Sequence, residues 1–324
     1  MTWELLAVGI LLATAAVAVH DFLHGQRLIP DLYEEWRIAR ADLATLDRAH
    51  QAAAERSVVI VTLTTIPSRL PYIEDTLKSL LRQTRLPAGI RLYVPAFSAR
   101  ENRPYEIPQR LRQLASVTIH ACSDLGPATK FIPALTSLPP DQLVLAVDDD
   151  RIYPPNLVAD LEAAARARTD AAYGFSGWIA PKDLIDKPTT VIANLLERPP
   201  VPIYAQRQRR PRPVDVLQGT GGYLIRPRFF ALDRLVDYSA APAAARSVDD
   251  VWMSAHCMVD KFVIPARRSN FQARRRMAIY KRTSLGWANR GRRNEERKNS
   301  IMLRYFADRW MVARQNPTAA RNDG

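Results

Sequence analysis

Short apolar runs alternate with helix-like segments along the first half of the chain. Four runs rich in Val, Ile and Leu have the length of buried strands: 58–63, 90–94, 117–120 and 143–147. Between them, apolar residues recur with helical spacing at 71–81, at 107–114 and after Pro127. Strands that alternate with helices require crossover connections. The pattern therefore predicts an α/β fold with a mostly parallel, Rossmann-like sheet flanked by helices.

The second half of the chain is less regular. A helix is predicted from Asp249, with an apolar face formed by Val251, Trp252, Ala255 and Val259. Gly-Thr-Gly-Gly at 219–222 separates two apolar runs. Three further elements are predicted: a loop rich in Pro, Arg and Gln at 199–213, a strand at 262–264 and an amphipathic helix at 294–312.

An uncharged apolar stretch lies near the N-terminus. It runs from Leu5 to Val19, which is shorter than the roughly 20 residues that span a bilayer comfortably. No Lys or Arg precedes it, which argues against a signal peptide, and Arg27, Arg37 and Arg40 follow it. This asymmetry of basic residues predicts a single membrane anchor with the rest of the chain in the cytoplasm. A cleaved or buried helix is the alternative.

These patterns divide the chain into four parts. We expect a transmembrane or signal-anchor helix at 1–20, a stalk or helical connector at 21–56, the main α/β domain at 57–265 and a basic helical region at 266–324. The connector is polar and helix-prone and has only a loose apolar stripe. It is therefore expected to form either a stalk or a helix that lies on the main domain.

Basic residues are concentrated at the C-terminal end. Residues 261–324 hold 17 of the 46 Lys and Arg but only 4 of the 33 Asp and Glu. Such a region suits a phospholipid surface, a pyrophosphate or a nucleic acid, and a solvated helix face is the plain alternative. We expect these residues to lie against anionic lipid, although Lys281 and Arg282 could instead close over a pyrophosphate. Without an ordered series of stacking aromatics or a recognised motif, nucleic acid is not an expected partner.

Three consecutive aspartates follow the strand predicted at 143–147. Ligands gather at the carboxyl ends of strands in open parallel sheets, and crowded carboxylates there need a cation to neutralise them. Alternate residues of an extended segment point the same way. Asp148 and Asp150 are thus predicted to hold a divalent cation, Mn²⁺ or Mg²⁺, with Asp149 turned aside. A turn that caps the following helix is the alternative. The two cysteines and five scattered histidines have no zinc-site spacing.

This Asp-x-Asp pattern resembles that of the GT-A nucleotide-sugar glycosyltransferases, most closely family two. The resemblance covers roughly residues 57–265. Three other segments match the family in order: Val-Thr-Leu-Thr-Thr-Ile-Pro-Ser-Arg-Leu at 61–70, Asp-Leu-Gly-Pro-Ala-Thr-Lys at 124–130, and the pair at 249–250 followed by Val-Trp. The resemblance implies a GT-A fold and transfer of a sugar from a UDP- or GDP-sugar. The acceptor would be a hydroxyl of a glycan, a lipid-linked group or another molecule.

The resemblance also implies roles for individual residues. Asp250 would be the catalytic base of an inverting reaction, with Asp249 beside it. The residues expected to bind the donor are Thr64, Pro67, Arg69, Asp124, Lys130, Asp148 and Asp149. The residues expected to contact the acceptor are Gly221, Gly222 and Trp252, the last by stacking on a sugar.

Each of these assignments has a structural alternative. The hydroxyls near Thr64 and the acids at 249–250 could cap helices, and Lys130 could be a solvated surface residue. The sequence also departs from the family. Tyr-Val-Pro-Ala-Phe at 93–97 stands where many members carry an acidic pair, and no histidine follows His256 to complete a metal site. The identity of the nucleotide base is therefore left open, and pyrophosphate and water are expected to complete the metal shell.

Two other functions compete with sugar transfer. A nucleotidyltransferase or phosphotransferase would use the same metal-binding acids, but it would usually carry a glycine-rich phosphate loop. The corresponding segment at 62–69 contains no glycine. A membrane-tethered binding protein could instead meet acidic partners through its C-terminal arginines.

Overall fold

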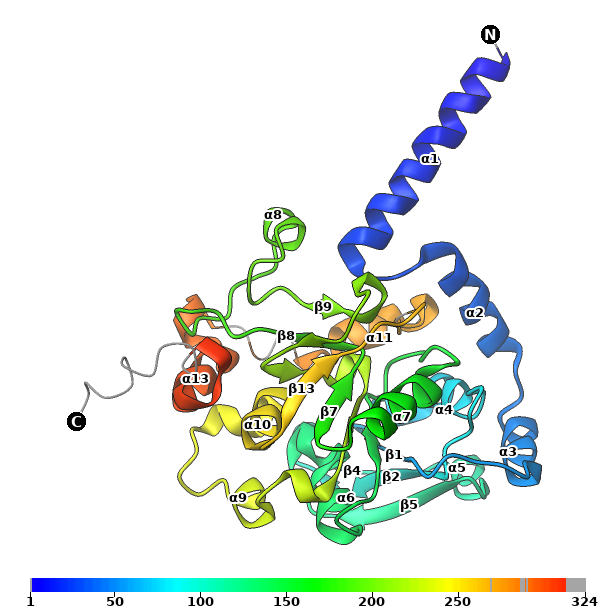
Figure 1. The fold of residues 1–324 in the computed structure, drawn as a ribbon. Coiled ribbons are helices and arrows are strands. Elements are labelled where there is room, and N and C mark those ends of the chain that lie inside the picture. Colours follow the sequence, from blue (N-terminus) through cyan, green and yellow to red (C-terminus); the bar gives the residue numbers. More distant parts are fainter. Residues whose placement is uncertain (1, 269, 286–288, 290, 313–324) are drawn as a thin grey trace.

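The computed structural model describes residues 2–268, 270–285, 289 and 291–312, and its main feature is a sheet of eight strands (Figure 1). The strands follow the order β10 (Arg212–Pro213), β13 (Asp260–Val263), β7 (Ala171–Gly174), β12 (Tyr223–Ile225), β6 (Val144–Ala146), β1 (Ile60–Thr64), β2 (Gly89–Pro95) and β5 (Val117–Cys122). A three-stranded sheet contains β11 (Val216–Leu217), β8 (Ser176–Trp178) and β9 (Ile203–Tyr204). A two-stranded sheet pairs β3 (Phe97–Ser98) with β4 (Arg103–Pro104).

Most pairings in the main sheet are parallel. β5, β2, β1 and β6 run parallel to one another, and so do β7 and β13. The exception in the middle is β12, which pairs antiparallel with both β6 and β7. Val61 and Leu63 of β1 and all three residues of β6 are completely buried, as expected for strands covered on both faces. Helices flank the sheet, which confirms the predicted α/β class.

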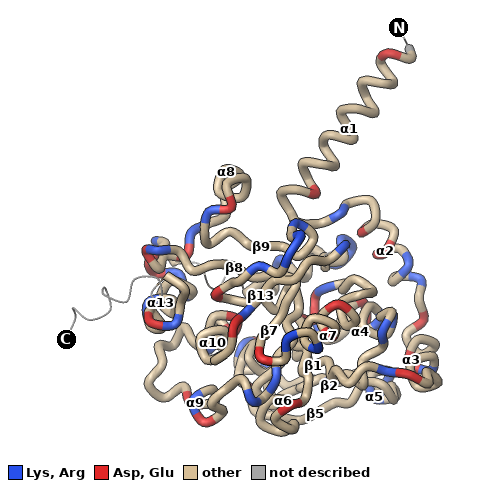
Figure 2. The backbone as a smooth tube through the Cα atoms, in the orientation of Figure 1, with Lys and Arg blue, Asp and Glu red and all other residues tan. Residues whose placement is uncertain are grey.

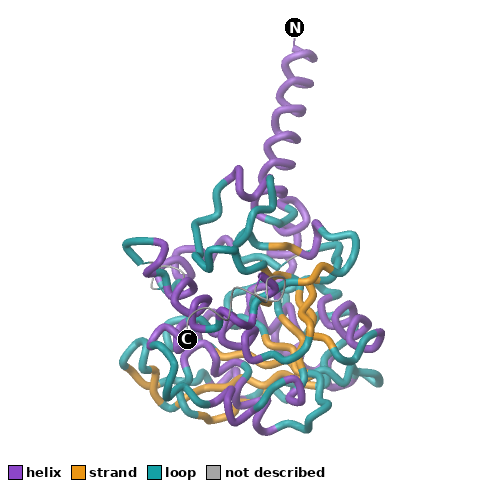
Figure 3. Tube along the Cα trace, turned by 60° about the vertical axis from the view of Figure 1, so that its left-hand side comes forward, coloured by secondary structure: helices purple, strands orange, loops and turns teal. Residues whose placement is uncertain are grey.

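The helices of the N-terminal half are α1 (Thr2–His24), α2 (Leu28–Arg40), α3 (Leu43–Ala52), α4 (Glu74–Leu80), α5 (Gln109–Arg112), α6 (Ile132–Ser137) and α7 (Leu157–Ala167). Those that follow are α8 (Val191–Leu195), α9 (Leu232–Val236), α10 (Asp249–His256), α11 (Met277–Arg282) and α13 (Lys298–Tyr305). Figure 3 shows the strands gathered within the body, with helices and loops around them.

The N-terminal helix projects away from the rest of the molecule (Figures 1 and 3). It is 23 residues long, and the apolar segment at 3–24 has a mean hydropathy of 2.0 with none of its most apolar window buried. At about 1.5 Å per residue the helix is roughly 34 Å long, which exceeds the hydrocarbon core of about 30 Å. This helix is long and apolar enough to cross a membrane, and a signal sequence near an N-terminus has the same length and apolar composition.

The connector forms two helices that lie on the main domain, because α2 and α3 both pack against α4. Three arginines from the basic C-terminal region pair with acids of α2 and α4. Arg275 contacts Asp75 of α4 at 2.5 Å and Glu35 of α2 at 3.4 Å. Arg274 lies 3.7 Å from Glu35, and Arg276 lies 3.7 Å from Asp75. These arginines were expected to meet lipid headgroups. In the structure they pair with buried carboxylates of α2 and α4, a long-range pairing that charge counts do not reveal, and contact of this region with lipid stays a prediction.

The predicted helix at 294–312 is divided in the structure. Two 3₁₀ turns, Asn294–Glu296 and Ala307–Arg309, flank α13. The backbone at Arg297 is extended, and its guanidinium pairs with the buried carboxylate of Asp186 at 2.9 Å. This tertiary ion pair accompanies the break in the helical pattern.

Candidate active site

A cleft of about 330 Å³ lies at the carboxyl ends of β1 and β6. From β1 the chain continues to β2 and β5 on one side and then returns to β6 on the other. Ligands bind at such switch points because the connections leave in opposite directions and open a crevice. The parallel register pairs Thr62 with Ala146. The same offset of 84 residues brings Thr65 beside Asp149, and the Thr65 hydroxyl donates to the Asp149 Oδ2 at 2.5 Å.

Lys130 lies at the centre of one half of the cleft. It ends the 3₁₀ turn Gly126–Lys130 and is 4% exposed. Its Nζ lies 2.7 Å from Asp148 Oδ1, 2.8 Å from Asp249 Oδ2 and 3.7 Å from Asp250 Oδ1. One ammonium thus joins the acids that follow β6 to the acids that begin α10. Lys130 is therefore a buried charge within the site and not a solvated surface lysine.

Arg69 neutralises the other half of the cleft. Its Nη1 lies 2.9 Å from Asp149 Oδ1 and 3.2 Å from Asp150 Oδ2. The same guanidinium donates to the hydroxyl and the carbonyl of Thr283, at 2.7 and 3.0 Å. Arg100 also donates to the Thr283 carbonyl, at 2.5 Å. Arg69 therefore connects the acidic turn to the segment that follows α11.

The three consecutive aspartates do not alternate as the extended pattern predicted. Asp149 and Asp150 share Arg69, whereas Asp148 faces Lys130. The strand ends at Ala146 and the chain turns at residues 149–150, so the period of two does not apply. Hydrogen bonds also hold this turn, since the Thr76 hydroxyl donates to the Asp149 carbonyl at 2.8 Å.

Burial and charge change the pKa values of these groups in opposite directions. Burial alone would raise the pKa of Asp148, but Lys130, through its charge and hydrogen bond, together with the charges of Arg151 and Arg69 holds the pKa below its usual value. Burial raises the pKa of Asp149 despite the charge of Arg69. Burial, followed by repulsion from Asp249, raises the pKa of Asp250 to about 8. The cleft therefore holds one carboxylate suited to accept a proton near neutral pH.

The two acids of α10 differ in their surroundings. Asp249 is in close contact with Lys130, and its side chain is 11% exposed. Asp250 is more open to the cleft, with 28% of its side chain exposed, and its Oδ1 accepts the Gly219 amide at 3.0 Å. The N-cap position of α10 is Val248, whose apolar side chain makes no capping hydrogen bond. The arrangement gives Asp249 a structural ion pair and leaves Asp250 facing the cleft.

Most of the residues predicted to bind a donor line this cleft: Thr64, Arg69, Asp124, Lys130, Asp148 and Asp149. Asp124 accepts the amides of Gly126 and Ala99, each at 2.8 Å, so it also shapes the loop. Gly126 has φ +63°, and a Cβ there would lie 2.6 Å from the Arg246 carbonyl, so the position requires glycine. Pro67 is not among the residues that line the cleft.

The predicted acceptor residues are not among those that line the cleft. Gly221 is buried, and a Cβ on it would lie 2.4 Å from the Ser176 amide, so it serves close packing of backbone. Gly222 has φ +71° and supports the turn into β12. Trp252 is 2% exposed, its ring stacks on Tyr238 at 4.3 Å, and its Nε1 donates to the Leu235 carbonyl. None of these three residues is among those that line the cleft, whereas Trp178 is a tryptophan that does line it.

We expect Trp252→Ala to lower the free energy of unfolding by about 3–5 kcal/mol, because it removes a large buried ring. Trp36→Ala is the matched control, since that ring is 50% exposed, and it should cost less than about 0.5 kcal/mol. Denaturant titration of the two variants measures the difference. Equal losses would contradict the placement of Trp252 in the core.

Sequence patterns did not identify several residues of the cleft. Arg100, Tyr105, Gln218, Thr220, Gln272, Ser284 and Asn299 line it as well. Gln272 donates to Asp150 Oδ2 at 2.7 Å, and the Tyr105 hydroxyl donates to the Thr65 carbonyl at 2.9 Å. Segments beyond residue 265, which the sequence assigned to a separate basic region, thus contribute to the same cleft. Lys281 and Arg282 are exposed and are not among its lining residues.

No protein-family model matches the sequence, and no curated protein matches it. Among solved structures, the chain is similar to GalNAc-T7 with UDP, GalNAc and Mn²⁺, at 13% identity and a TM-score of 0.42, covering 64% of this chain and 41% of that chain. It is also similar to S. aureus TarS 1–349 in complex with UDP, at 14% identity and a TM-score of 0.40. That match covers 81% of this chain and 75% of the TarS chain. A third similar structure is S. aureus TarS 1–349 in complex with UDP-GlcNAc, at 15% identity and a TM-score of 0.37. That match covers 65% of this chain and 56% of the TarS chain. The chain thus spans less than half the length of the GalNAc-T7 chain.

Proposed function

We propose that this protein is a GT-A-type glycosyltransferase that moves a sugar from a UDP- or GDP-sugar to an acceptor hydroxyl with inversion. One observation carries the proposal. At the switch point of the sheet, a single cleft contains a carboxylate with a raised pKa, Asp250, beside a buried ammonium, Lys130, and the acidic turn after β6. This combination supplies a base for the acceptor and charged groups for a diphosphate.

In the proposed reaction, Asp250 removes the proton from the acceptor hydroxyl. The oxygen then forms a bond to the anomeric carbon, and the bond to the nucleoside diphosphate breaks, with the electron pair leaving on its phosphate oxygen. Lys130 and Arg69 are positioned to offset the charge that develops there, because both line the cleft. Asp249 would keep Lys130 in place through their 2.8 Å contact.

The acids of the cleft also fit a divalent cation in their chemistry. Five carboxylates, at 148–150 and 249–250, adjoin three basic side chains in the described part of the chain, those of Lys130, Arg69 and Arg151. The described residues contain no group of three His, Cys, Asp or Glu arranged as a metal site. Mg²⁺, however, often takes only one or two protein carboxylates and completes its shell with phosphate and water. We propose Asp148 and Asp150 as those ligands; in this structure they pair with Lys130 and Arg69 respectively, and both carboxylates would have to turn toward a bound cation. A bound Mg²⁺ or Mn²⁺ would neutralise charge on the diphosphate.

We further propose that α1 spans a membrane and that the remainder of the chain lies in the cytoplasm. The length and exposure of α1 support the span. The orientation is supported by the exposed Arg27, Arg37 and Arg40, which follow the helix closely. The acceptor would then be a glycan or lipid-linked molecule present on that side.

The function is tested by incubating the purified full-length protein with a panel of UDP- and GDP-sugars and measuring release of the nucleoside diphosphate. We expect release with one donor class, its loss on chelation of divalent cations and its recovery with Mn²⁺ or Mg²⁺. Asp148→Asn and Asp150→Asn should each abolish metal-dependent donor binding in calorimetry without loss of fold.

Asp141→Asn is the matched control, because that side chain is 78% exposed and pairs with Arg228 at the surface. It should bind the donor as the unchanged protein does. Full activity in chelator would remove the metal from the proposal. Release of pyrophosphate, with the nucleotide transferred, would instead indicate a nucleotidyltransferase.

A further inference from the structure

Helix α8 presents an unusual apolar surface. Val191, Ile192, Leu195 and Leu196 are 57%, 66%, 59% and 55% exposed. Their spacing places them on one face of the helix, while Asn194 on the other face is buried. Four large aliphatic side chains exposed within six residues form a contiguous patch rather than scattered surface residues. Such patches mark a protein or membrane contact.

Helix α8 is attached to the end of α1 by specific contacts. The Asn194 Nδ2 donates to the Leu23 carbonyl at 2.9 Å, and Arg207 Nη1 donates to Asn194 Oδ1 at 2.7 Å. The Arg207 guanidinium also lies 4.4 Å from the centre of the Phe22 ring. Helix α8 is therefore held close to the last turn of α1 through its buried Asn194 face, which leaves the apolar face turned outward. Figure 1 shows α8 on the side of the body from which α1 projects.

Helix α2, which follows α1 directly, has its polarity reversed relative to a helix of a water-soluble domain. Its acidic residues Asp31, Glu34 and Glu35 are buried against the protein, where Glu34 meets Arg82 at 3.1 Å. Its outward residues include an apolar and aromatic stripe of Ile29, Leu32, Tyr33 and Trp36, with exposures of 66%, 46%, 56% and 50%. Positions i, i+3, i+4 and i+7 share one helix face. An apolar stripe that faces outward suggests an apolar surrounding.

Exposed arginines lie close in the chain to both apolar faces. Arg37 and Arg40 lie over the rings of Tyr33 and Trp36, at 5.7 and 4.5 Å. Other exposed arginines nearby in the chain are Arg27, Arg198, Arg209 and Arg210. Figure 2 shows basic positions below α8, at the base of α1 and along α2. Tyr, Trp and Arg are favoured at the level of lipid headgroups, and arginines attract anionic lipid.

We propose that the outward faces of α2 and α8 form a membrane-contact surface on either side of α1, inserted among the headgroups of an anionic bilayer. This inference rests on the proposed span of α1. It adds that α1 is not a free tether, because two further contacts fix the orientation of the catalytic domain against the bilayer. Contact with the membrane here covers the apolar side chains that would otherwise face water.

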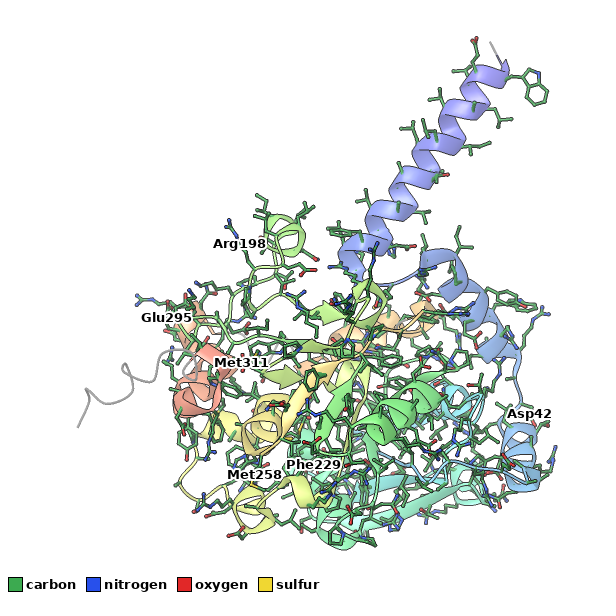
Figure 4. The ribbon with its side chains drawn as sticks, in the orientation of Figure 1. Asp42, Arg198, Phe229, Met258, Glu295 and Met311 are labelled. Carbon is green, nitrogen blue, oxygen red and sulfur yellow. The ribbon has the colours of Figure 1, made fainter. Side chains whose placement is uncertain are left out.

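Spin-label depth measurements on the full-length protein in vesicles of phosphatidylcholine and phosphatidylglycerol test the surface. Cys122 and Cys257 are replaced by alanine, and a single nitroxide is attached at Ile29→Cys or Ile192→Cys. Oxygen concentrates in lipid, whereas a nickel chelate stays in water. For both labels, the ratio of collisions with oxygen to collisions with the nickel chelate should be several-fold higher than for a label at Met258→Cys. Met258 is 62% exposed and lies at the opposite end of the molecule (Figure 4).

A label at Val8→Cys in α1 separates this inference from the anchor itself. If the label at position 8 is exposed to lipid but the label at 29 or 192 has the oxygen-to-nickel collision ratio of a residue in water, the contact surface is overturned and the membrane span of α1 is retained. Water-like ratios at 8, 29 and 192 would overturn both. Removal of phosphatidylglycerol should make positions 29 and 192 shallower while position 8 remains unchanged, because only the headgroup contact depends on charge.

Discussion

Lys130→Met is expected to lower the free energy of unfolding by about 3–5 kcal/mol and to abolish donor binding. The side chain is buried, and its ammonium is within 2.8 Å of both Asp148 and Asp249. Its removal leaves these buried carboxylates without their partner, and an uncompensated buried charge costs far more than the ion pair itself contributes. Urea titration followed by circular dichroism measures the loss, and calorimetry with the nucleotide measures binding.

Lys187→Met is the matched control for that experiment. Lys187 forms an ion pair with Asp183 in which the side chains are 49% and 42% exposed, so its loss should cost less than about 1 kcal/mol. In the double variant Lys130→Met/Asp249→Asn one of the stranded charges is removed, and part of the stability should return. If Lys130→Met and Lys187→Met cost the same, Lys130 does not hold the carboxylates together.

Asp250→Asn is expected to reduce kcat by about 10²–10⁴-fold, the usual contribution of a general base, while donor affinity stays within about threefold. The amide oxygen of asparagine can still accept the Gly219 amide, which the carboxylate accepts at 3.0 Å, so the local fold should persist. Single-turnover kinetics and donor titration separate the two effects. Unchanged turnover in Asp250→Asn would transfer the role of base to another group.

Asp249→Asn is the comparison variant. Asp249 contacts Lys130 and is less exposed than Asp250, so its replacement should affect stability more and kcat less. The opposite ranking, with the larger loss of kcat in Asp249→Asn, would exchange the two assignments.

The pH dependence of the unchanged protein gives an independent test of the same assignment. Burial and the neighbouring Asp249 raise the pKa of Asp250 to about 8, and a base acts only when it is unprotonated. kcat/KM should therefore rise with pH and level off above about 8, with roughly a tenth of the plateau value at pH 7. The residual activity of Asp250→Asn should lack this inflection.

Local patterns in the sequence determine much of the fold of this protein. The runs that form β1, β2 and β6 are mostly buried, whereas β5 is a partly exposed edge strand, and the alternation of these runs with helices predicted the α/β class. The acids at 148–150 were predicted to lie at a strand end, and that end lies at the switch point of the sheet. Such features depend on residues close in the chain, because periodicity and strand length are local properties.

Tertiary structure decided which of these residues meet. Lys130 reaches Asp249 across 119 positions of sequence, and Arg69 reaches Thr283 across 214. The arginines at 274–276 pair with Glu35 and Asp75, which are distant in the sequence. Trp252 belongs to the core because Tyr238 covers its ring. Composition and spacing identify chemical types and faces, but ion pairs and burial depend on how distant segments pack, and only the folded chain brings those segments together.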